Sequence, residues 1–295
     1  MRLTLQLSRE KMRSILFGLF VGLVTALLIG AASLLGAAPV TLAIPIIIAI
    51  AIAMAALHHW KTLHFQAMRE GFNQISNRLA LLDDHISETQ GLVQLSTFNQ
   101  PYPMPFGGGW ALTPDAAVLL AREIALNNPG IIVELGSGVS TILIGRILKR
   151  AGRGRLFSLD HDAHWAEQTR RHIRASGLED YVEVLDAPLA KQQFADKDFN
   201  WYQVPERLRQ AGQIDMLVVD GPPQRLDPTG LPRYPALPAF HAQLSPQALI
   251  YVDDAKRPQE KQMIEKWLRE YPGFESRMFD TVPGTCLLQS KARHR

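Results

Sequence analysis

One short segment of the chain joins an acid to two glycines: Glu134-Leu135-Gly136-Ser137-Gly138. Glycines at a turn let the backbone approach a ligand without a side-chain clash, and the helix expected from Ser140 offers its free N–H groups there. A dinucleotide site receives a pyrophosphate at such a place. The acid two residues before Gly136 suits the ammonium of a ligand with an amino-acid end better than a phosphate. The segment predicts a ligand-binding turn, and a dinucleotide site or a purely structural turn remains the alternative.

Acidic residues also stand at the ends of the apolar runs that follow along the chain. Asp160 and Asp186 close two of these runs, and Asp220 and the pair Asp253-Asp254 close two more. The carboxyl ends of parallel strands meet at one edge of a sheet, where ligands bind near the point at which the strand order reverses. We therefore expect these carboxylates to line one site.

The elements that position these residues alternate between strands and helices from Thr113 onward. Strands are expected over 131–135, 156–159, 182–185, 214–219, 248–252, 274–279 and 285–288, and helices over 113–126, 140–150, 163–175 and 259–270. The helix at 113 begins with an N-cap residue, a proline and an early acid. Strands separated by helices indicate an α/β fold with a doubly wound, mostly parallel sheet of seven strands.

At these residues the chain resembles class I S-adenosylmethionine-dependent methyltransferases, whose first motif reads acid-x-Gly-x-Gly. The resemblance covers Trp110 to Ser290 and implies their Rossmann-like fold and S-adenosylmethionine as cofactor. It implies that Glu134 lies near the methionine ammonium and that Asp160 holds the ribose hydroxyls. The cofactor-binding residues that it implies are Glu134, Gly136, Ser137, Gly138, Ser140, Thr141, Asp160, His161, Asp186 and Ala187.

The later acids resemble the magnesium ligands of catechol O-methyltransferase and related enzymes, in which an Asp and an Asp-Asn pair bind the metal. Asp220, Asp253 and Asp254 are therefore candidate metal ligands for Mg²⁺, and Asp220 is the candidate catalytic residue. Converging carboxylates repel one another unless a hard cation or protons neutralise them, and a bound Mg²⁺ lowers the pKa of an attacking hydroxyl. Asp254 replaces the family's Asn, and Pro223 replaces its lysine base. The alternative is that Asp220 binds cofactor or substrate while the pair caps a loop.

The Pro- and Gly-rich segment 225–238 follows the strand that ends at Asp220. Long loops in this place usually carry substrate specificity. The Trp201-Tyr202 pair covers a cofactor, stacks on a substrate or packs in the core. The segments Asp-Gly-Pro-Pro and Arg-Tyr-Pro-Ala-Leu-Pro resemble those of a bacterial group of methyltransferase-like proteins. This resemblance does not identify a substrate. The candidate substrate contacts are Trp110, Arg225, Arg233 and Tyr234.

An uncharged block from Ser14 to Leu57 precedes this domain. It divides near Pro39 into two apolar runs, each about long enough to cross a hydrocarbon core of roughly 30 Å. Four basic residues precede the block, and Lys61 and Arg69 follow it. The positive-inside rule then predicts a transmembrane hairpin in the inner (cytoplasmic) membrane, with both termini and the catalytic domain in the cytoplasm. A cleavable signal peptide is the alternative.

Apolar residues between the block and the domain recur in alternating steps of three and four from Phe65 to Ile86. This pattern predicts either a coiled coil, and hence a homodimer, or a single amphipathic helix. The resulting organisation is a basic N-terminus (1–13), a transmembrane hairpin (14–57), a stalk (58–96), a linker (97–109), a methyltransferase-like domain (110–290) and a basic tail (291–295).

Composition limits the partners. The net charge of +3 arises largely in the two terminal segments, and no basic stripe interleaved with aromatics appears inside the domain, so no nucleic-acid partner is expected. Cys286 is the single cysteine and lies in an apolar run, which predicts a buried thiol.

Three functions are consistent with the sequence. The first is a membrane-anchored methyltransferase that acts on an oxygen of a small-molecule, lipid-linked or glycan substrate. The second is a non-catalytic cofactor-binding scaffold of a membrane complex. The third is a metal-dependent enzyme of another reaction type, since a fold does not fix its chemistry.

Overall fold

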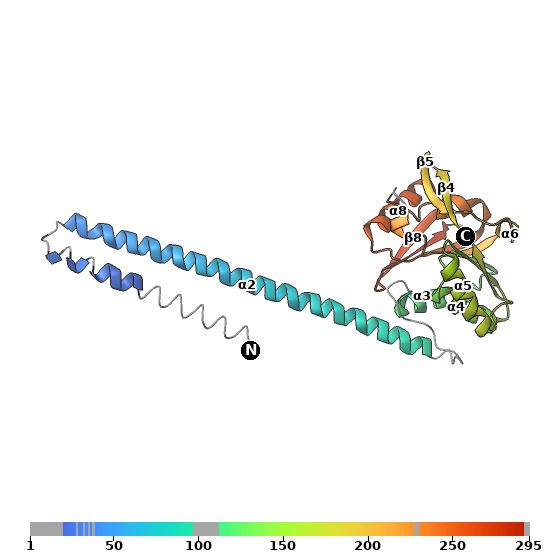
Figure 1. Ribbon diagram of the computed structural model, residues 1–295, viewed down its shortest axis with the longest axis horizontal. Coiled ribbons are helices and arrows are strands. Elements are labelled where there is room, and N and C mark those ends of the chain that lie inside the picture. Colours follow the sequence, from blue (N-terminus) through green and yellow to red (C-terminus); the bar gives the residue numbers. More distant parts are fainter. Residues whose placement is uncertain are drawn as a thin grey trace. The chain divides into compact units, whose positions relative to one another are not determined.

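The computed structural model describes residues 20–27, 29–31, 33–34, 36, 39–96, 112–226 and 230–291 (Figure 1). The chain divides into two compact units, Met1–Leu82 and Asp83–Arg295. The predicted basic N-terminus (1–13), the linker (97–109) and the tail beyond Lys291 lie outside the described residues, as does Trp110.

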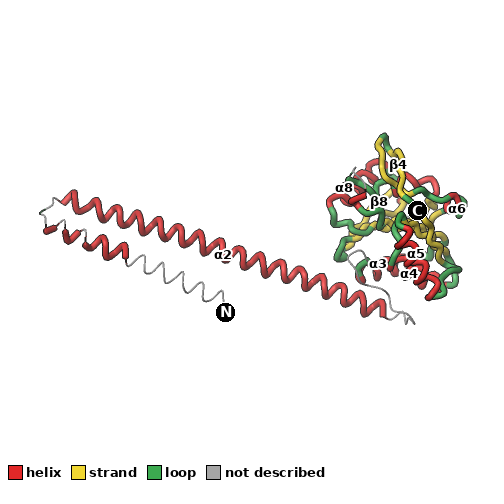
Figure 2. Tube along the Cα trace, in the orientation of Figure 1, coloured by secondary structure: helices red, strands yellow, loops and turns green. Residues whose placement is uncertain are grey.

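Helix α2 (Pro39–Ser96) is one continuous helix, which includes both the predicted second span and the whole predicted stalk (Figure 2). The described residues between 20 and 34 are helical as well. Val21 and Thr25 from that segment and Ile46 and Ile50 from α2 line a common groove, so the two helical segments pack side by side.

No helix in the described ranges is both long enough and apolar enough to cross a membrane. The predicted localisation in the inner membrane is therefore wrong, and the transmembrane hairpin at 14–57 is not confirmed. The prediction counted the apolar run before Leu57 as a span with its own end. In the structure, that run is the first part of a helix of 58 residues, which goes on without a break through Lys61 and Arg69.

The sheet of the second unit has seven strands in the order β3-β2-β1-β6-β7-β9-β8. All neighbouring pairs from β3 to β7 are parallel, and β9 is antiparallel to both β7 and β8. This confirms the predicted Rossmann-like, mostly parallel seven-stranded sheet. The strands are β1 (Ile131–Leu135), β2 (Arg155–Asp160), β3 (Val182–Asp186), β6 (Ile214–Val219), β7 (Leu244–Val252), β8 (Phe274–Phe279) and β9 (Thr285–Ser290).

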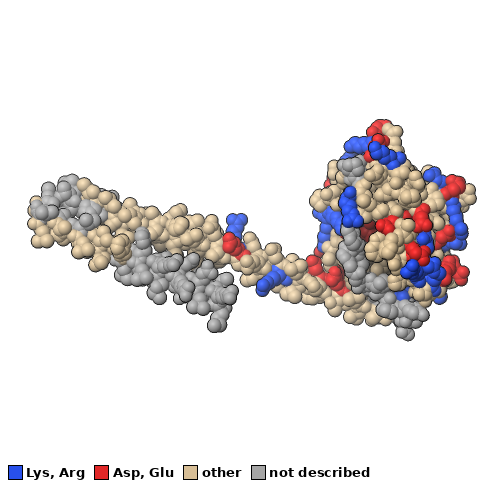
Figure 3. Space-filling view, viewed as in Figure 1, with Lys and Arg blue, Asp and Glu red and all other residues tan. Residues whose placement is uncertain are grey.

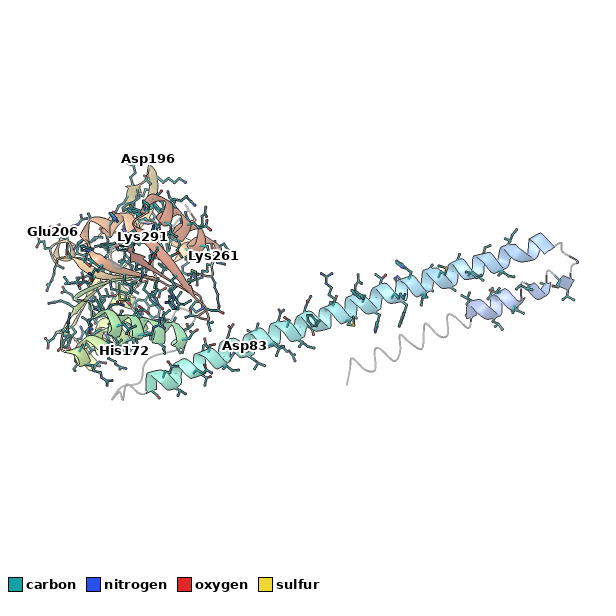
Figure 4. All side chains as sticks on the ribbon, turned by 180° about the vertical axis from the view of Figure 1, so that it is seen from behind. Asp83, His172, Asp196, Glu206, Lys261 and Lys291 are labelled. Atoms are coloured by element: carbon teal, nitrogen blue, oxygen red, sulfur yellow. The ribbon has the colours of Figure 1, made fainter. Side chains whose placement is uncertain are left out.

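Helices cover both faces of this sheet. Helices α3 (Pro114–Asn127), α4 (Val139–Ala151) and α5 (Ala163–Ala175) pack on the face that contains Ile132. Helices α7 (Ala236–Phe240) and α8 (Pro258–Glu270) pack on the face that contains Val133. Successive strand residues point to opposite faces, and a strand buried on both faces reads as an unbroken apolar run. In Figure 4 the label of His172 locates α5, on the first face, and the label of Lys261 locates α8, on the second.

Helix α3 precedes the sheet in sequence, and hydrogen bonds connect it to strands near the C-terminal end of the chain. The Asp115 carboxylate accepts a hydrogen bond of 2.6 Å from the Val282 backbone N–H. The Tyr251 hydroxyl donates one of 2.9 Å to the Ala116 carbonyl oxygen. These two bonds therefore join α3 to β7 and to the loop between β8 and β9.

A β-hairpin was not foreseen from the sequence. Strands β4 (Leu189–Phe194) and β5 (Lys197–Tyr202) pair antiparallel outside the main sheet, and Asp196 lies at their tip (Figure 4). Ala195 and Asp196 both have positive φ, of 48° and 62°, as a tight hairpin turn requires. The turn uses neither Asn-Gly nor Asp-Gly, and β4 carries polar residues on both sides, so the usual hairpin signals are missing. The remaining short helices are α6 (Glu206–Arg209), η1 (Gln224–Leu226) and η2 (His241–Gln243).

Charges of both signs are interspersed on the face of this unit drawn in Figure 3, whereas residues 39–60 of α2 contain no Lys, Arg, Asp or Glu. Many of these charges are paired. The Glu183 carboxylate contacts Arg155 at 3.0 Å and Arg207 at 2.9 Å. Exposed pairs of this kind contribute little to stability.

Gly91 provides a test of how the end of α2 packs on α3. A Cβ at Gly91 would lie 2.6 Å from the carbonyl carbon of Pro114 and 2.7 Å from the nitrogen of Asp115. Backbone atoms cannot rotate away, so we expect Gly91→Ala to separate residues 83–96 from α3 and to speed amide hydrogen exchange in both segments.

Gly71→Ala is the matched control, because nothing lies within 4 Å of a Cβ there. Alanine should favour the helix at that position by about 1 kcal/mol, so exchange should stay the same or slow. Unchanged exchange around α3 in Gly91→Ala would contradict the packing described here.

Candidate active site

The strand order reverses between β1 and β6, because the chain leaves β1 for β2 and β3 on one side and returns to β6 and β7 on the other. Backbone hydrogen bonds extend past the strand ends and draw the following residues together. Gly136 N–H donates to the Leu159 carbonyl oxygen at 2.9 Å, and Asp220 N–H donates to that of Leu135 at 3.1 Å. Asp253 N–H donates to Val219 at 3.1 Å. The predicted carboxylates thus converge at the switch point, where open α/β sheets bind ligands.

The glycine turn after β1 needs its first glycine for conformation. Gly136 has φ +99°, a left-handed value that side chains disfavour. A Cβ there would also lie 3.4 Å from the Gly221 nitrogen. Gly138 is extended, with φ 171°, and its N–H donates to the Thr141 hydroxyl at 2.8 Å. The turn therefore passes close to the strand-end segment that follows β6.

Glu134 is fully buried beneath this turn. Its Oε2 accepts hydrogen bonds from the Thr141 hydroxyl at 2.5 Å and from the Ser158 hydroxyl at 2.6 Å. Its Oε1 has no hydrogen-bond partner among the described residues. Burial raises the pKa of Glu134 to about 7, and the nearby hydroxyls of Ser140, Ser158 and Thr141 oppose the shift. One carboxylate oxygen is left to receive a donor from outside the protein.

Asp160 ends β2 and fastens the glycine turn to it. Its Oδ2 accepts from the Ser137 backbone N–H at 3.1 Å and from the Ser137 hydroxyl. Its Oδ1 accepts from the Asp162 N–H at 3.0 Å and lies 3.5 Å from His161 Nδ1. Asp160 is buried, and Ser137 occupies its Oδ2.

The two residues at the end of β3 differ in exposure. The Asp186 side chain is 56% exposed and pairs with Arg170 at 2.7 Å. Ala187 is buried, and its N–H donates to the Asp160 carbonyl oxygen at 2.7 Å. The third strand thus adds one surface acid and one buried contact to the edge of the site.

Tyr202 enters the switch point from the unforeseen hairpin. The side chain is fully buried, and its hydroxyl has no hydrogen-bond partner in the part of the chain that the structure describes. The hydroxyl lies so close to Gly221 that a Cβ at that position would overlap it. Burial raises the pKa of Tyr202 well above its usual value, so this phenol is a neutral hydrogen-bond donor. The sequence singled out the Trp201-Tyr202 pair but not this placement.

Asp220, Asp253 and Asp254 each offer a carboxylate oxygen, and these oxygens lie within 4.8 Å of one another. A buried guanidinium joins them. Arg233 Nη2 lies 3.3 Å from Asp220 Oδ1 and 3.0 Å from Asp254 Oδ2. Arg233 Nη1 donates to the Asp253 carbonyl oxygen at 3.3 Å. Arg257 Nη1 adds a second contact of 2.6 Å to Asp254 Oδ2.

Burial dominates the electrostatics of this cluster. It raises the pKa of Asp220 to about 6, although Arg233 opposes the shift. It also raises the pKa of Asp253 well above its usual value, with repulsion from Asp220 and Asp254 adding to the shift. Burial alone would lower the pKa of Arg233, but attraction to Asp220, Asp254 and Glu260 outweighs it and raises that pKa.

Three of the four candidate substrate contacts lie in the described residues, and they differ in exposure. Arg225 is exposed, whereas Arg233 and Tyr234 are buried. The Tyr234 hydroxyl donates to Glu270 at 2.6 Å, and Trp110 lies outside the described residues. Their contact with a substrate stays a prediction. Cys286 is buried as expected, and burial raises the pKa of its thiol to about 12.

A doubly wound sheet with a glycine turn and acids at its switch point defines an α/β domain of the nucleotide- or cofactor-binding class. Residues 133–255 match the family model described as a methyltransferase domain. This part of the chain is therefore a methyltransferase domain, and the prediction of a methyltransferase is confirmed. No curated protein matches the chain.

Several solved structures are similar to it in fold. A SAH-bound methyltransferase from Podospora anserina is 14% identical with a TM-score of 0.47, over 70% of this chain and 88% of that one. An O-methyltransferase from Bacillus cereus in complex with SAH is 18% identical with a TM-score of 0.46, over 70% and 90%. An O-methyltransferase from Streptomyces achromogenes in complex with SAM is 16% identical with a TM-score of 0.43, over 69% and 89%. Because these values are low, the match to the family model is the finding that classifies the domain.

The raised pKa of Glu134 predicts a pH-dependent stability difference between Glu134→Gln and the unchanged protein. The raised pKa makes a contribution to the free energy of unfolding. This contribution is fully present below pH 4.5, the pKa of the group in the unfolded chain, and is lost as the pH rises through about 7, its pKa in the folded protein. Below pH 4.5 the two proteins should have equal stability. Above pH 7 the variant should be more stable, by up to about 3 kcal/mol.

Urea unfolding followed over that pH range measures the difference. Comparing the two proteins largely cancels the contributions of Asp220 and Asp253, which both retain. A stability difference that does not change with pH would show that Glu134 does not titrate in the folded state near neutrality.

Proposed function

We propose that the domain binds S-adenosylmethionine at the switch point between β1 and β6 and transfers its methyl group to a hydroxyl oxygen of a small-molecule or glycan acceptor. One observation supports this proposal most directly. Glu134 presents a fully buried carboxylate oxygen without a partner among the described residues, directly before the glycine turn. A buried carboxylate oxygen costs free energy unless a donor reaches it. The ammonium of the methionine end is such a donor.

The other residues of the site suit the rest of this cofactor. Asp160 would receive the ribose hydroxyls in exchange for the Ser137 hydroxyl, which contacts it now. His161 and Asp186 stand at the solvent edge, where the adenine would lie. When bound, the cofactor supplies a methyl group on a positively charged sulfur, ready for transfer to a nucleophile.

Asp220 is the group of this site best suited to take the proton of an acceptor hydroxyl. Its side chain is 23% exposed, more than those of Asp254 and Arg233 beside it. Its pKa of about 6 lies near the operating range of a general base. Methyl transfer should therefore rise as pH increases through about 6, as the Asp220 carboxylate forms.

Mg²⁺ is not part of the proposal. Three carboxylates are ligands of the right type for this ion, which takes oxygen ligands at about 2.0–2.1 Å in octahedral geometry. Arg233 Nη2, however, lies within 3.3 Å of two of them. With that guanidinium in place the residues do not fit a divalent cation.

Isothermal titration calorimetry of the full chain tests the cofactor. Glu134→Gln keeps the shape of the side chain but removes its charge, so S-adenosylmethionine should bind about 10- to 100-fold more weakly, as for a lost charge-assisted hydrogen bond. 5′-Methylthioadenosine lacks the amino-acid end, so its affinity should not change in this variant. Asp160→Asn should weaken both ligands.

Glu167→Gln is the control variant, since Glu167 lies on the exposed side of α5 and pairs with Arg174. The proposal fails if the unchanged protein does not bind S-adenosylmethionine, or if Glu134→Gln binds it equally well. Transfer of a labelled methyl group to an extract component, lost in Asp220→Asn, would distinguish a catalyst from a cofactor-binding scaffold.

We also propose that the stalk pairs with a second copy of the chain as a coiled coil. The apolar residues that alternate at three and four positions are all more than half exposed on α2. Such a stripe normally packs against a partner helix. These residues are Phe65, Met68, Phe72, Ile75, Leu79, Leu82 and Ile86.

Oxidative crosslinking tests the pairing. Leu79→Cys places a thiol on the stripe, whereas Asn77→Cys places one on the opposite side of the same helix turn and serves as the control. Cys286 is buried and should not react. We expect a covalent dimer from Leu79→Cys but not from Asn77→Cys. Equal crosslinking of the two variants would rule out pairing through these apolar residues.

A further inference from the structure

We propose that the Arg233 guanidinium is a built-in replacement for a divalent cation at the strand-end carboxylates, so that this site works without a metal. The inference concerns the chain's own residues after β6 and β7. Only the consequence for Asp220 rests on the proposed function.

The position of the guanidinium is the first support. A single nitrogen, Nη2, lies 3.3 Å from Asp220 Oδ1 and 3.0 Å from Asp254 Oδ2. These are two of the three residues whose carboxylate oxygens come within 4.8 Å of one another. A cation bound between these carboxylates would have to share this space with a positive group.

The second support is that Arg233 is fixed in place. Arg233 is 4% exposed, and its neighbour Tyr234 is held on three sides. The Tyr234 hydroxyl donates to Glu270, and its carbonyl oxygen accepts from Trp267 Nε1 at 2.9 Å. The Phe199 ring stacks on Tyr234 with centroids 5.3 Å apart. The backbone beside Arg233 is therefore anchored in the core, and its buried guanidinium is held by the ion pairs to Asp220 and Asp254.

The third support is that the guanidinium satisfies several acceptors at once. Nη1 donates to the Asp253 carbonyl oxygen at 3.3 Å and lies 3.8 Å from Glu260 Oε1. A planar guanidinium presents several donors in a rigid fork and stays charged at any physiological pH. It thus provides permanent positive charge where carboxylates converge, as a metal would, but offers no open coordination position.

The consequence for the reaction concerns Asp220. Its carboxylate is the more exposed partner of Arg233, at 23% against 12% for Asp254. Arg233 contacts its Oδ1, so Oδ2 would be the oxygen that takes the proton of the acceptor hydroxyl. Arg233 is thus a positioning residue for Asp220.

Mn²⁺ binding to the full chain, followed by electron paramagnetic resonance, tests the replacement. We expect the unchanged protein to bind no Mn²⁺ stoichiometrically, and EDTA to leave its melting temperature unchanged. Arg233→Ala removes the guanidinium and keeps the three carboxylates, so this variant should bind one Mn²⁺ per chain and melt at a higher temperature with it. A second substitution, Asp220→Asn, should abolish that gain.

Two further variants serve as controls. Arg233→Lys keeps a positive charge and should bind no Mn²⁺. Arg209→Ala removes an exposed arginine that contacts none of the three carboxylates, and it should bind no Mn²⁺ either. Stoichiometric Mn²⁺ binding by the unchanged protein, or its absence in folded Arg233→Ala, would overturn the inference. Should Arg233→Ala not fold, the titration of the unchanged protein decides alone: one bound ion per chain refutes the replacement, and none supports it.

The metal test and the cofactor test have separate readouts. Mn²⁺ binding by the unchanged protein would refute the role of Arg233 and leave S-adenosylmethionine binding untouched. A chain that binds neither Mn²⁺ nor S-adenosylmethionine would refute the proposed function while leaving the replacement standing.

Discussion

The site depends on one constraint: carboxylates at the ends of buried parallel strands must find positive or hydrogen-bonding partners away from water. The fold meets it in three ways. Glu134 accepts hydrogen bonds from the hydroxyls of Thr141 and Ser158. Asp160 accepts hydrogen bonds from the backbone N–H and the hydroxyl of Ser137. Asp220 and Asp254 both pair with the guanidinium of Arg233. Each solution also fixes a loop, so the acids that prepare the site for a ligand hold its walls in place as well.

The parts of this arrangement that local pattern encodes could be predicted. Apolar runs such as 131–135 and 214–219 became β1 and β6 at the expected bounds, because a strand covered on both faces needs an unbroken apolar sequence. The convergence of Asp160 and Asp220 followed from the same sheet rule, since parallel strands end at one edge. The glycine requirement at residue 136 likewise appears as a positive φ.

What could not be predicted depends on contacts between distant segments. Nothing in the sequence around Arg233 indicates that its side chain turns inward onto Asp220, because that contact depends on the packing of Tyr234 against Trp267 and Phe199. The hairpin that brings Tyr202 to Gly221 lacks turn residues of the usual kind. The membrane localisation was wrong for a related reason: a count of uncharged residues before Leu57 does not show where a helix ends, and α2 continues to Ser96.

The hydrogen bonds that join α3 to β7 and to the β8–β9 hairpin affect how the domain is made. The hydrogen bonds Asp115–Val282 and Tyr251–Ala116 join residues 167 and 135 positions apart. The second can form once β7 has left the ribosome, whereas the first must wait for the loop between β8 and β9. Folding rates fall as the average sequence separation of contacts grows. Until then the inner face of α3 and the edge of β7 stay open to water. Truncation within β9 should therefore affect the amount of folded protein more than the chemistry of its site.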